Sequence, residues 1–311
     1  MQGWLCQGRP FPRCHCGPAR LIQDCRGVNP PESLMSYPLV SVLALAAALA
    51  VGPASAATLD RVRDSGVFRI GYRADAKPYS YRNEHGQAAG YIVDLCAEVA
   101  KALGPDVRTE YVLVPADNRF EAVRDGRVDI LCDPSTITME RRALVDFSIP
   151  TFLDGASALS RTSKPVRVYE DLGGKRVGVL ERTTTERTLR TSLDELGLKS
   201  TVVGVRDHRT GFDMLADDKI DAYFADRGIL LAMLQEGGRP GFEISRQYFS
   251  YETYALALPR DDGAFRLLVD RTLAGLYRIG KIHSVLEKTF GKGQPHELLK
   301  AMILINSLPE K

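Results

Sequence analysis

Four segments of the chain carry polar side chains suited to binding a charged small molecule, and each follows a predicted strand. Arg73 comes directly after the first strand, and Thr136 and Arg141 follow a later one, where a hydroxyl-rich segment runs into a short helix. Helix N-terminal amides and an arginine fork are suited to a carboxylate or a phosphate. The alternative interpretation is an ordinary helix cap formed by Thr136 or Thr138, with a solvated Arg141.

The same pattern recurs in the second half of the chain. Thr183 and Thr184 follow a predicted strand, and the helix after them carries Glu186 in its first turn. These residues could bind a ligand or form no more than a capping box. Asp226 follows a further strand, where its carboxylate could pair with a substrate ammonium. The alternative is a local ion pair with Arg227, which would contribute little stability.

Motifs of the common hydrolases, metalloproteases and nucleotide-binding proteins do not occur in the sequence. It has no Gly-x-Ser-x-Gly, no His-Glu-x-x-His and no glycine-rich loop that ends in Lys-Ser/Thr. Only five histidines occur, and a lone histidine such as His208 is more often a structural or surface residue than a ligand. The sequence therefore predicts neither a cofactor nor a metal site, and no catalytic residue.

Strands and helices alternate twice along the chain, and this alternation positions the four segments. The hydrophobic patterns predict strands at 67–72, 109–114, 128–131, 176–180, 201–205, 222–224 and 253–258, and helices at 90–104, 118–124, 211–216, 228–235, 265–279, 282–290 and 296–303, with a further helix that ends at 196. Two such sets predict two α/β lobes, each a mostly parallel sheet flanked by helices. Ligands of open α/β sheets bind at the carboxyl ends of strands, which is where the four segments lie.

Composition agrees with a globular protein. The 311 residues are 44% hydrophobic and 26% charged, with a formal net charge of +2. These values exclude a disordered tail protein, a collagen and a disulfide-dense miniprotein. The nearly balanced charge provides no electrostatic reason to expect a nucleic-acid partner.

Residues 35–56 have the features of a secretory signal peptide. An uncharged, Leu/Ala/Val-rich run at 38–52 precedes Ala54-Ser55-Ala56, whose small residues suit signal peptidase. The run is too short for a membrane span of about 20 residues, although an uncleaved anchor is the alternative. We interpret residues 1–34 as a mis-assigned or disordered extension before a true start at Met35, and we expect the mature protein in the periplasm.

Two cysteines, Cys96 and Cys132, follow the predicted cleavage site. In an oxidising compartment an isolated pair is a candidate disulfide. Two free buried thiols are the other possibility, because cysteine is a frequent core residue. One lies on a predicted helix and the other at a strand end, which allows contact without requiring it.

Three stretches resemble the periplasmic amino-acid-binding proteins of ABC importers, the family 3 solute-binding proteins. They are LDRVRDSGVFRIGYR at 59–73, GYIVDL at 90–95, and a GxxD…TxxxxR…DFSxP pattern at 126–150. The resemblance implies a Venus-flytrap fold in which 58–156 with 254–311 form one lobe and 157–253 the other, joined by two hinge crossings. A monomer of this kind would capture an amino acid between its lobes and deliver it to an inner-membrane ABC permease.

The resemblance also implies roles for individual residues. In that family the matches to Arg141 and Thr136 hold the ligand α-carboxylate, and the match to Asp226 holds the α-ammonium. The sequence is most similar to the glutamate/aspartate-binding branch. There the matches to Arg73, Arg119 and His208 surround the distal carboxylate, and the match to Thr183 adds a hydroxyl. The ligand-binding set that this predicts is Arg73, Arg119, Thr136, Arg141, Thr183, Thr184, His208 and Asp226.

Departures from that branch leave other functions open. Pro134, Ala116 and Leu180 stand where it has hydroxyl residues, and Arg182 where it has glycine. A binder of a neutral polar amino acid is one alternative. A periplasmic enzyme of the same fold, similar to cyclohexadienyl dehydratase, and a sensory domain that acts through a separate receptor are the others.

Overall fold

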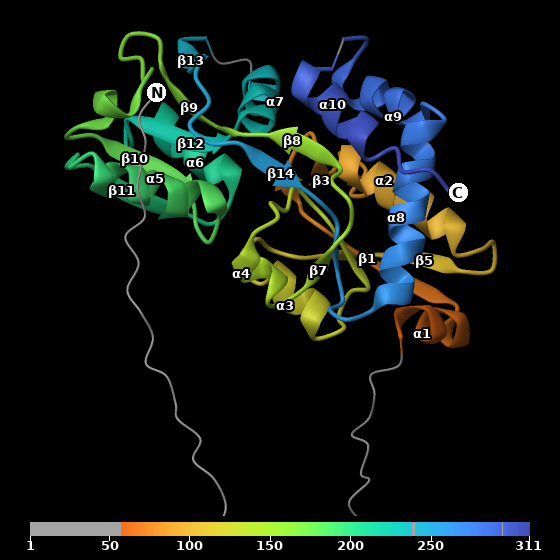
Figure 1. Cartoon of the computed structure of the whole chain (residues 1–311). Coiled ribbons are helices and arrows are strands. Elements are labelled where there is room, and N and C mark those ends of the chain that lie inside the picture. The colour runs from red at the N-terminus through yellow and green to blue at the C-terminus, as the bar shows by residue number, and fades with distance from the viewer. Residues whose placement is uncertain (1–56, 238–239, 294) are drawn as a thin grey trace, which may run out of the picture. The chain divides into compact units, whose positions relative to one another are not determined.

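The computed structural model describes residues 57–237, 240–293 and 295–311 (Figure 1). The predicted signal peptide and the segment before it lie outside the described residues. Two five-stranded sheets organise the described chain, and each is flanked by helices. This confirms the predicted two-lobed α/β architecture.

The first sheet has the strand order β5-β1-β6-β15-β7. Its strands are β1 (Val67–Tyr72), β5 (Arg108–Leu113), β6 (Ile130–Cys132), β7 (Asp146–Phe147) and β15 (Ala257–Leu258). β1 pairs in parallel with both β5 and β6, whereas β15 is antiparallel to its neighbours. Apolar side chains cover both faces: Phe68 and Ile70 pack in one cluster, and Phe120 and Val128 belong to another.

Helices and short strands complete this lobe. The helices are α1 (Thr58–Ser65), α2 (Tyr91–Ala102), α3 (Arg119–Arg124), α4 (Met139–Arg142), α8 (Gly263–Arg278), α9 (Lys281–Phe290) and α10 (Glu297–Ile305). A three-stranded antiparallel sheet follows β1 and consists of β2 (Asp75–Ala76), β3 (Ser80–Arg82) and β4 (Ala88–Ala89). Because β2 begins three residues after β1 ends, it lies close to the carboxyl end of the main sheet.

The second sheet has the order β11-β10-β12-β9-β13. Its strands are β9 (Ala156–Arg161), β10 (Arg176–Leu180), β11 (Thr201–Val205), β12 (Ala222–Asp226) and β13 (Phe242–Ile244). The helices around it are η1 (Tyr169–Leu172), α5 (Thr184–Glu195), α6 (His208–Ala216) and α7 (Arg227–Gly237). β10 is parallel to β11 and β12, which again places the ends of three strands at one edge.

Two strands connect the sheets. β8 (Phe152–Asp154) leads from β7 to β9, and β14 (Glu252–Tyr254) leads from β13 back to β15. They pair in antiparallel register, with Tyr254 opposite Phe152, and run side by side between the two sheets (Figure 1). The crossings therefore form a short two-stranded ribbon.

Most predicted elements are present, and two differences affect the site. α6 begins at His208 instead of Gly211, because Asp207 caps it by accepting from Thr210 N at 2.7 Å. β12 extends to Asp226 instead of ending at Phe224. Both predicted ligand-binding residues therefore lie inside regular elements, where the backbone holds them more firmly than a loop would.

Cys96 and Cys132 form a disulfide, a question that the sequence left open. Cys96 lies on α2 and Cys132 ends β6, with Cα atoms 6.3 Å apart, and both are completely buried. The bond joins positions 36 residues apart, which by loop entropy contributes about 4 kcal/mol to stability.

None of the helices in the described ranges is long and apolar enough to cross a bilayer.

Candidate functional site

All eight residues of the predicted ligand-binding set line one small cavity between the two sheets. Its volume is about 30 Å³. The first sheet's lobe contributes Arg73, Arg119, Thr136 and Arg141, and the second contributes Thr183, Thr184, His208 and Asp226. The convergence follows from topology, since these residues lie at strand carboxyl ends or at the helix N-termini just beyond them.

Arg141 lines the cavity from the short helix α4. Thr138 caps this helix by accepting from Arg141 N, so the capping alternative is correct for Thr138 and not for Thr136. The Arg141 guanidinium is nevertheless buried: Nη1 donates to Thr136 O at 2.7 Å, and the group lies 4.9 Å from the Phe120 ring centroid. A guanidinium has five N–H donors, so this bond leaves donors for an anion.

Asp226 is the last residue of β12. Its carboxylate accepts hydrogen bonds from Tyr254 Oη at 2.6 Å and from Thr185 Oγ1 at 3.2 Å. Desolvation, followed by the charges of Asp154 and Glu252, raises the pKa of Asp226 to about 7. A cation beside Asp226 would offset that desolvation, so the geometry suits an ammonium group. Arg227 is not its partner, because the Arg227 side chain donates to Ser245 O.

A second buried carboxylate lies near Asp226. Glu252, only 3% exposed, accepts from Thr184 Oγ1 and from Ser250 Oγ, each at 2.9 Å. Sequence reasoning missed Thr185, Glu252 and Tyr254. The available signal was a charged residue, Glu252, directly before the apolar strand pattern at 253–258, and its neighbours depend on the crossing ribbon.

Two further cationic side chains that line the cavity already have partners. Arg73 is buried and donates through Nη2 to Asp75 Oδ1 at 2.6 Å. Arg119 contacts Asp133, with Nε 3.1 Å from Oδ2 and both side chains at most 4% exposed. Burial lowers the pKa of Arg119 to about 10, which still leaves it charged at neutral pH.

His208 is a hydrogen-bonding group here and not a charge. Its Nδ1 lies 2.9 Å from Tyr223 Oη, and its side chain is buried. Burial lowers the pKa of His208 to about 4, so the ring is neutral at pH 7. A neutral imidazole can donate from one nitrogen and accept at the other.

The two threonines of the second lobe have different surroundings. Thr183 caps α5: its Oγ1 accepts from Glu186 N at 3.1 Å and donates to Leu180 O at 2.7 Å. Its hydroxyl hydrogen is therefore used locally. Thr184 Oγ1 lies 3.2 Å from Thr136 Oγ1, a direct contact across the cavity between the two lobes.

Further contacts join the lobes around the cavity. Arg182, which has a φ of 59°, donates through Nη1 to Asp117 O at 2.8 Å. Arg187 forms an ion pair with Glu140, and Lys77 forms one with Glu236. Arg182, whose role the sequence did not explain, therefore contacts the opposite lobe.

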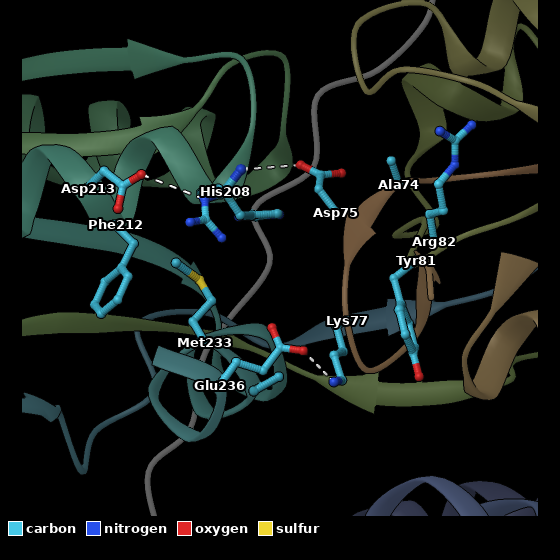
Figure 2. A pocket seen from close by; sticks show the side chains of 12 residues that line it. Ala74, Asp75, Lys77, Tyr81, Arg82, His208, Phe212, Asp213, Met233 and Glu236 are labelled. Carbon is cyan, nitrogen blue, oxygen red and sulfur yellow. Dashed lines mark hydrogen bonds and ion pairs between the residues drawn. The ribbon is translucent and has the colours of Figure 1, made fainter. Parts of the chain in front are cut away.

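A wider pocket of about 420 Å³ adjoins the cavity, and His208 lines both (Figure 2). Asp75 lines the wider pocket, while its partner Arg73 lines the cavity. No group of histidine, cysteine or acidic residues within the described ranges is arranged to hold a metal ion.

Comparison with known proteins agrees with this geometry. Residues 68–292 match the family model of bacterial extracellular solute-binding proteins, family 3. An L-glutamate/L-aspartate-binding protein of Pseudomonas aeruginosa is 29% identical over 85% of this chain and 89% of its own length. A cyclohexadienyl dehydratase of the same organism is 33% identical over 76% of this chain and 87% of its own length.

Structural similarity leads to the same family. A solved solute receptor for L-cysteine from Neisseria gonorrhoeae superposes with a TM-score of 0.69 and 28% identity. The superposition covers 77% of this chain and 98% of the receptor chain. The family model spans most of the chain, and the described lobes place charged side chains around one cavity. The chain therefore belongs to the bacterial extracellular solute-binding proteins of family 3.

Proposed function

We propose that this solute-binding protein captures an acidic amino acid, glutamate or aspartate, between its lobes in the periplasm and delivers it to an ABC permease. The observation that carries the proposal is the placement of Arg141 and Asp226 on one cavity whose remaining wall holds Arg73 and Arg119. A carboxylate, an ammonium and a polar side chain are the three groups that such a wall would bind.

The α-amino and α-carboxyl groups have complementary partners. Arg141 would hold the carboxylate, and Thr136 would add a hydroxyl 3.2 Å from Thr184 of the other lobe. Asp226, whose pKa is raised to about 7, would gain a cation that favours its ionised form. Charge-assisted hydrogen bonds of this kind are roughly twice as strong as neutral ones.

The side-chain end favours an anionic or polar group. Arg73, Arg119 and neutral His208 supply hydrogen-bond donors there, and a basic side chain would face two guanidinium groups at close range. The similarity to an L-glutamate/L-aspartate-binding protein supports an acidic ligand.

An enzyme of the same fold is the second candidate. A carboxyl group with a pKa near 7 in a cavity is suited to general acid–base chemistry, and a cyclohexadienyl dehydratase is among the similar proteins. Against this, Tyr254 and Thr185 already donate to the Asp226 carboxylate, which favours its use as an anion.

Calorimetry on the purified secreted protein, refolded to remove carried-over ligand, tests the proposal. We expect binding of glutamate or aspartate in preference to arginine. Arg141→Ala should weaken it at least ~100-fold, because losing one member of a buried charge pair costs about 3–5 kcal/mol. Arg142→Ala, which removes an exposed arginine from the same helix, should change affinity less than about threefold.

Other outcomes would change the assignment. Equal losses of affinity in the Arg141→Ala and Arg142→Ala variants would show that Arg141 does not bind the ligand. Binding of arginine in preference to acidic ligands would contradict the assignment of Arg73 and Arg119 to the side chain of the ligand. Turnover of a cyclohexadienyl acid without binding of any amino acid would favour the enzyme.

A further inference from the structure

Asp75 is a carboxylate of the protein located where a ligand side chain would end. It begins β2, three residues after β1, and its two oxygens have separate partners. Oδ1 accepts from Arg73 Nη2 at 2.6 Å. Oδ2 accepts from His208 N at 3.2 Å, a contact that Figure 2 shows. Both partners line the cavity.

Asp75 contacts His208, the residue that lines both the cavity and the wider pocket. The cavity of about 30 Å³ and the pocket of about 420 Å³ meet at His208, and Asp75 lies on the side of the wider pocket. Because Asp75 belongs to the first lobe and His208 to the second, the carboxylate also joins the lobes at this end. Because Arg73 Nη2 lies 2.6 Å from Asp75 Oδ1, a ligand side chain that reaches Arg73 approaches Asp75.

Asp75 is negatively charged at neutral pH. Burial pushes its pKa upward, but the charge of Arg73 and the hydrogen bonds from Arg73 and His208 N hold the pKa below its usual value. Arg73 is thus compensated before any ligand arrives. Arg119 is compensated in the same way by Asp133 at 3.1 Å.

A compensated arginine distinguishes poorly between an acid and its amide. A ligand carboxylate can accept from Arg73 but is repelled by Asp75, because like charges at close range disfavour each other. A ligand amide can accept from Arg73 through its oxygen and donate to Asp75 through its nitrogen.

We infer that Asp75 sets the selectivity of the site between acidic and amide side chains, and that glutamine or asparagine is bound in addition to the acids. The inference rests on the proposed amino-acid-binding function and names its ligand class more closely. It requires that glutamine bind the wild-type protein within about tenfold of glutamate, a difference of about 1.4 kcal/mol or less.

The test is the ratio of the glutamine Kd to the glutamate Kd, measured by calorimetry on the refolded protein. Asp75→Asn removes the charge and keeps the shape, so the ratio should rise at least tenfold in favour of glutamate. Asp75→Ser removes the charge with a different shape and should act in the same direction. Asp75→Glu keeps the charge and should leave the ratio near the wild-type value.

Asp213→Asn is the matched control. Asp213 also lines the wider pocket, on α6 five residues after His208 (Figure 2), and this variant removes one charge from a carboxylate that lies 3.8 Å from Arg209 Nε on the same helix. Its ratio should stay within about twofold of the wild type. Thermal unfolding of each variant shows whether it is folded.

Three results would overturn the inference. One is a wild-type protein that binds glutamine more than about tenfold more weakly than glutamate, a measurement that needs no variant. Another is an unchanged ratio in both charge-removing variants. The third is an equal weakening of both ligands, which would make Asp75 a contact between lobes and nothing else. Failure of the wild type to bind any amino acid would instead reject the proposed function itself.

Discussion

The proposed ligand has an α-amino-acid end, at Arg141 and Asp226, and a side-chain end, at Arg73 and Arg119, and the protein balances its charges differently at these two ends. At the end with Arg141 and Asp226, the guanidinium is bonded to a backbone carbonyl and the carboxylate to two hydroxyls. At the other end, Arg73 and Arg119 each contact a carboxylate of the protein. The first end would therefore gain most from a zwitterion, whereas the second is already neutralised and can distinguish ligands by hydrogen bonding.

This difference assigns separate tasks to the two ends. Protein side chains whose charged partner only a ligand can supply, Arg141 and Asp226, should control affinity, because their charges are desolvated and incompletely paired. Internally paired groups should control selectivity, because a ligand there exchanges one partner for another. The expectations below test that division, beginning with the largest change in binding.

The largest loss should follow Asp226→Asn. The variant leaves the ligand ammonium without its charged partner, so glutamate and glutamine should both bind at least ~100-fold more weakly, with their Kd ratio unchanged. Asp221→Asn is the control. It removes a carboxylate that lies just before the same strand and pairs with the half-exposed Arg176. This variant should change neither Kd by more than about threefold. A shift in the ratio with Asp226→Asn would show that the two ends are not independent.

Acidification should weaken binding through the same residue. The ammonium requires the ionised form of Asp226, so a pKa of about 7 predicts little change above pH 7 and a loss of roughly tenfold per unit as the pH falls below it. Binding near pH 6.5 should release a proton, which calorimetry in buffers of different ionisation enthalpy measures. His208, with a pKa of about 4, should add no step between pH 6 and 8.

The proton release has its own control. In Asp226→Asn it should disappear while the weak residual binding becomes independent of pH in this range. Proton release that persists in the variant would assign the titration to another group.

A smaller and selective loss is expected for Arg73→Gln. The amide of the new side chain at position 73 can still donate to the ligand, and Asp75 keeps its hydrogen bond from His208 N. Glutamate should bind about tenfold more weakly and glutamine less than threefold. Arg82→Gln, an exposed arginine beside the wider pocket, is the control and should affect neither ligand. Equal losses for both ligands would contradict a selective role for this end.

The smallest effect on binding should come from loss of the disulfide. Replacing both Cys96 and Cys132 by alanine should lower the free energy of unfolding by about 4 kcal/mol, measured by denaturant titration. Both positions lie in the core of the first lobe, so glutamate affinity should change less than about threefold. A large loss of affinity in folded protein would show that the disulfide positions the cavity wall.

Much of the fold could be predicted from the sequence because hydrophobic periodicity is local. The alternation of strands and helices predicted two α/β lobes, and the rule for strand carboxyl ends identified the segments of Arg73, Arg141, Thr183 and Asp226. All eight predicted residues line one cavity. The boundaries of α6 and β12 were less accurate, because a cap at Asp207 and pairing with β9 extend them.

The pairing of the charges could only be decided by tertiary structure. Residue types predicted donors at the side-chain end, and local spacing did not reveal that Asp75 compensates Arg73 while also meeting His208, 133 residues away. Nor did it reveal that Tyr254, from the return crossing, donates to Asp226. The sequence by itself determined which groups line the cavity, because periodicity and strand ends are local properties. Their charge balance depends on contacts between segments that only the folded chain brings together.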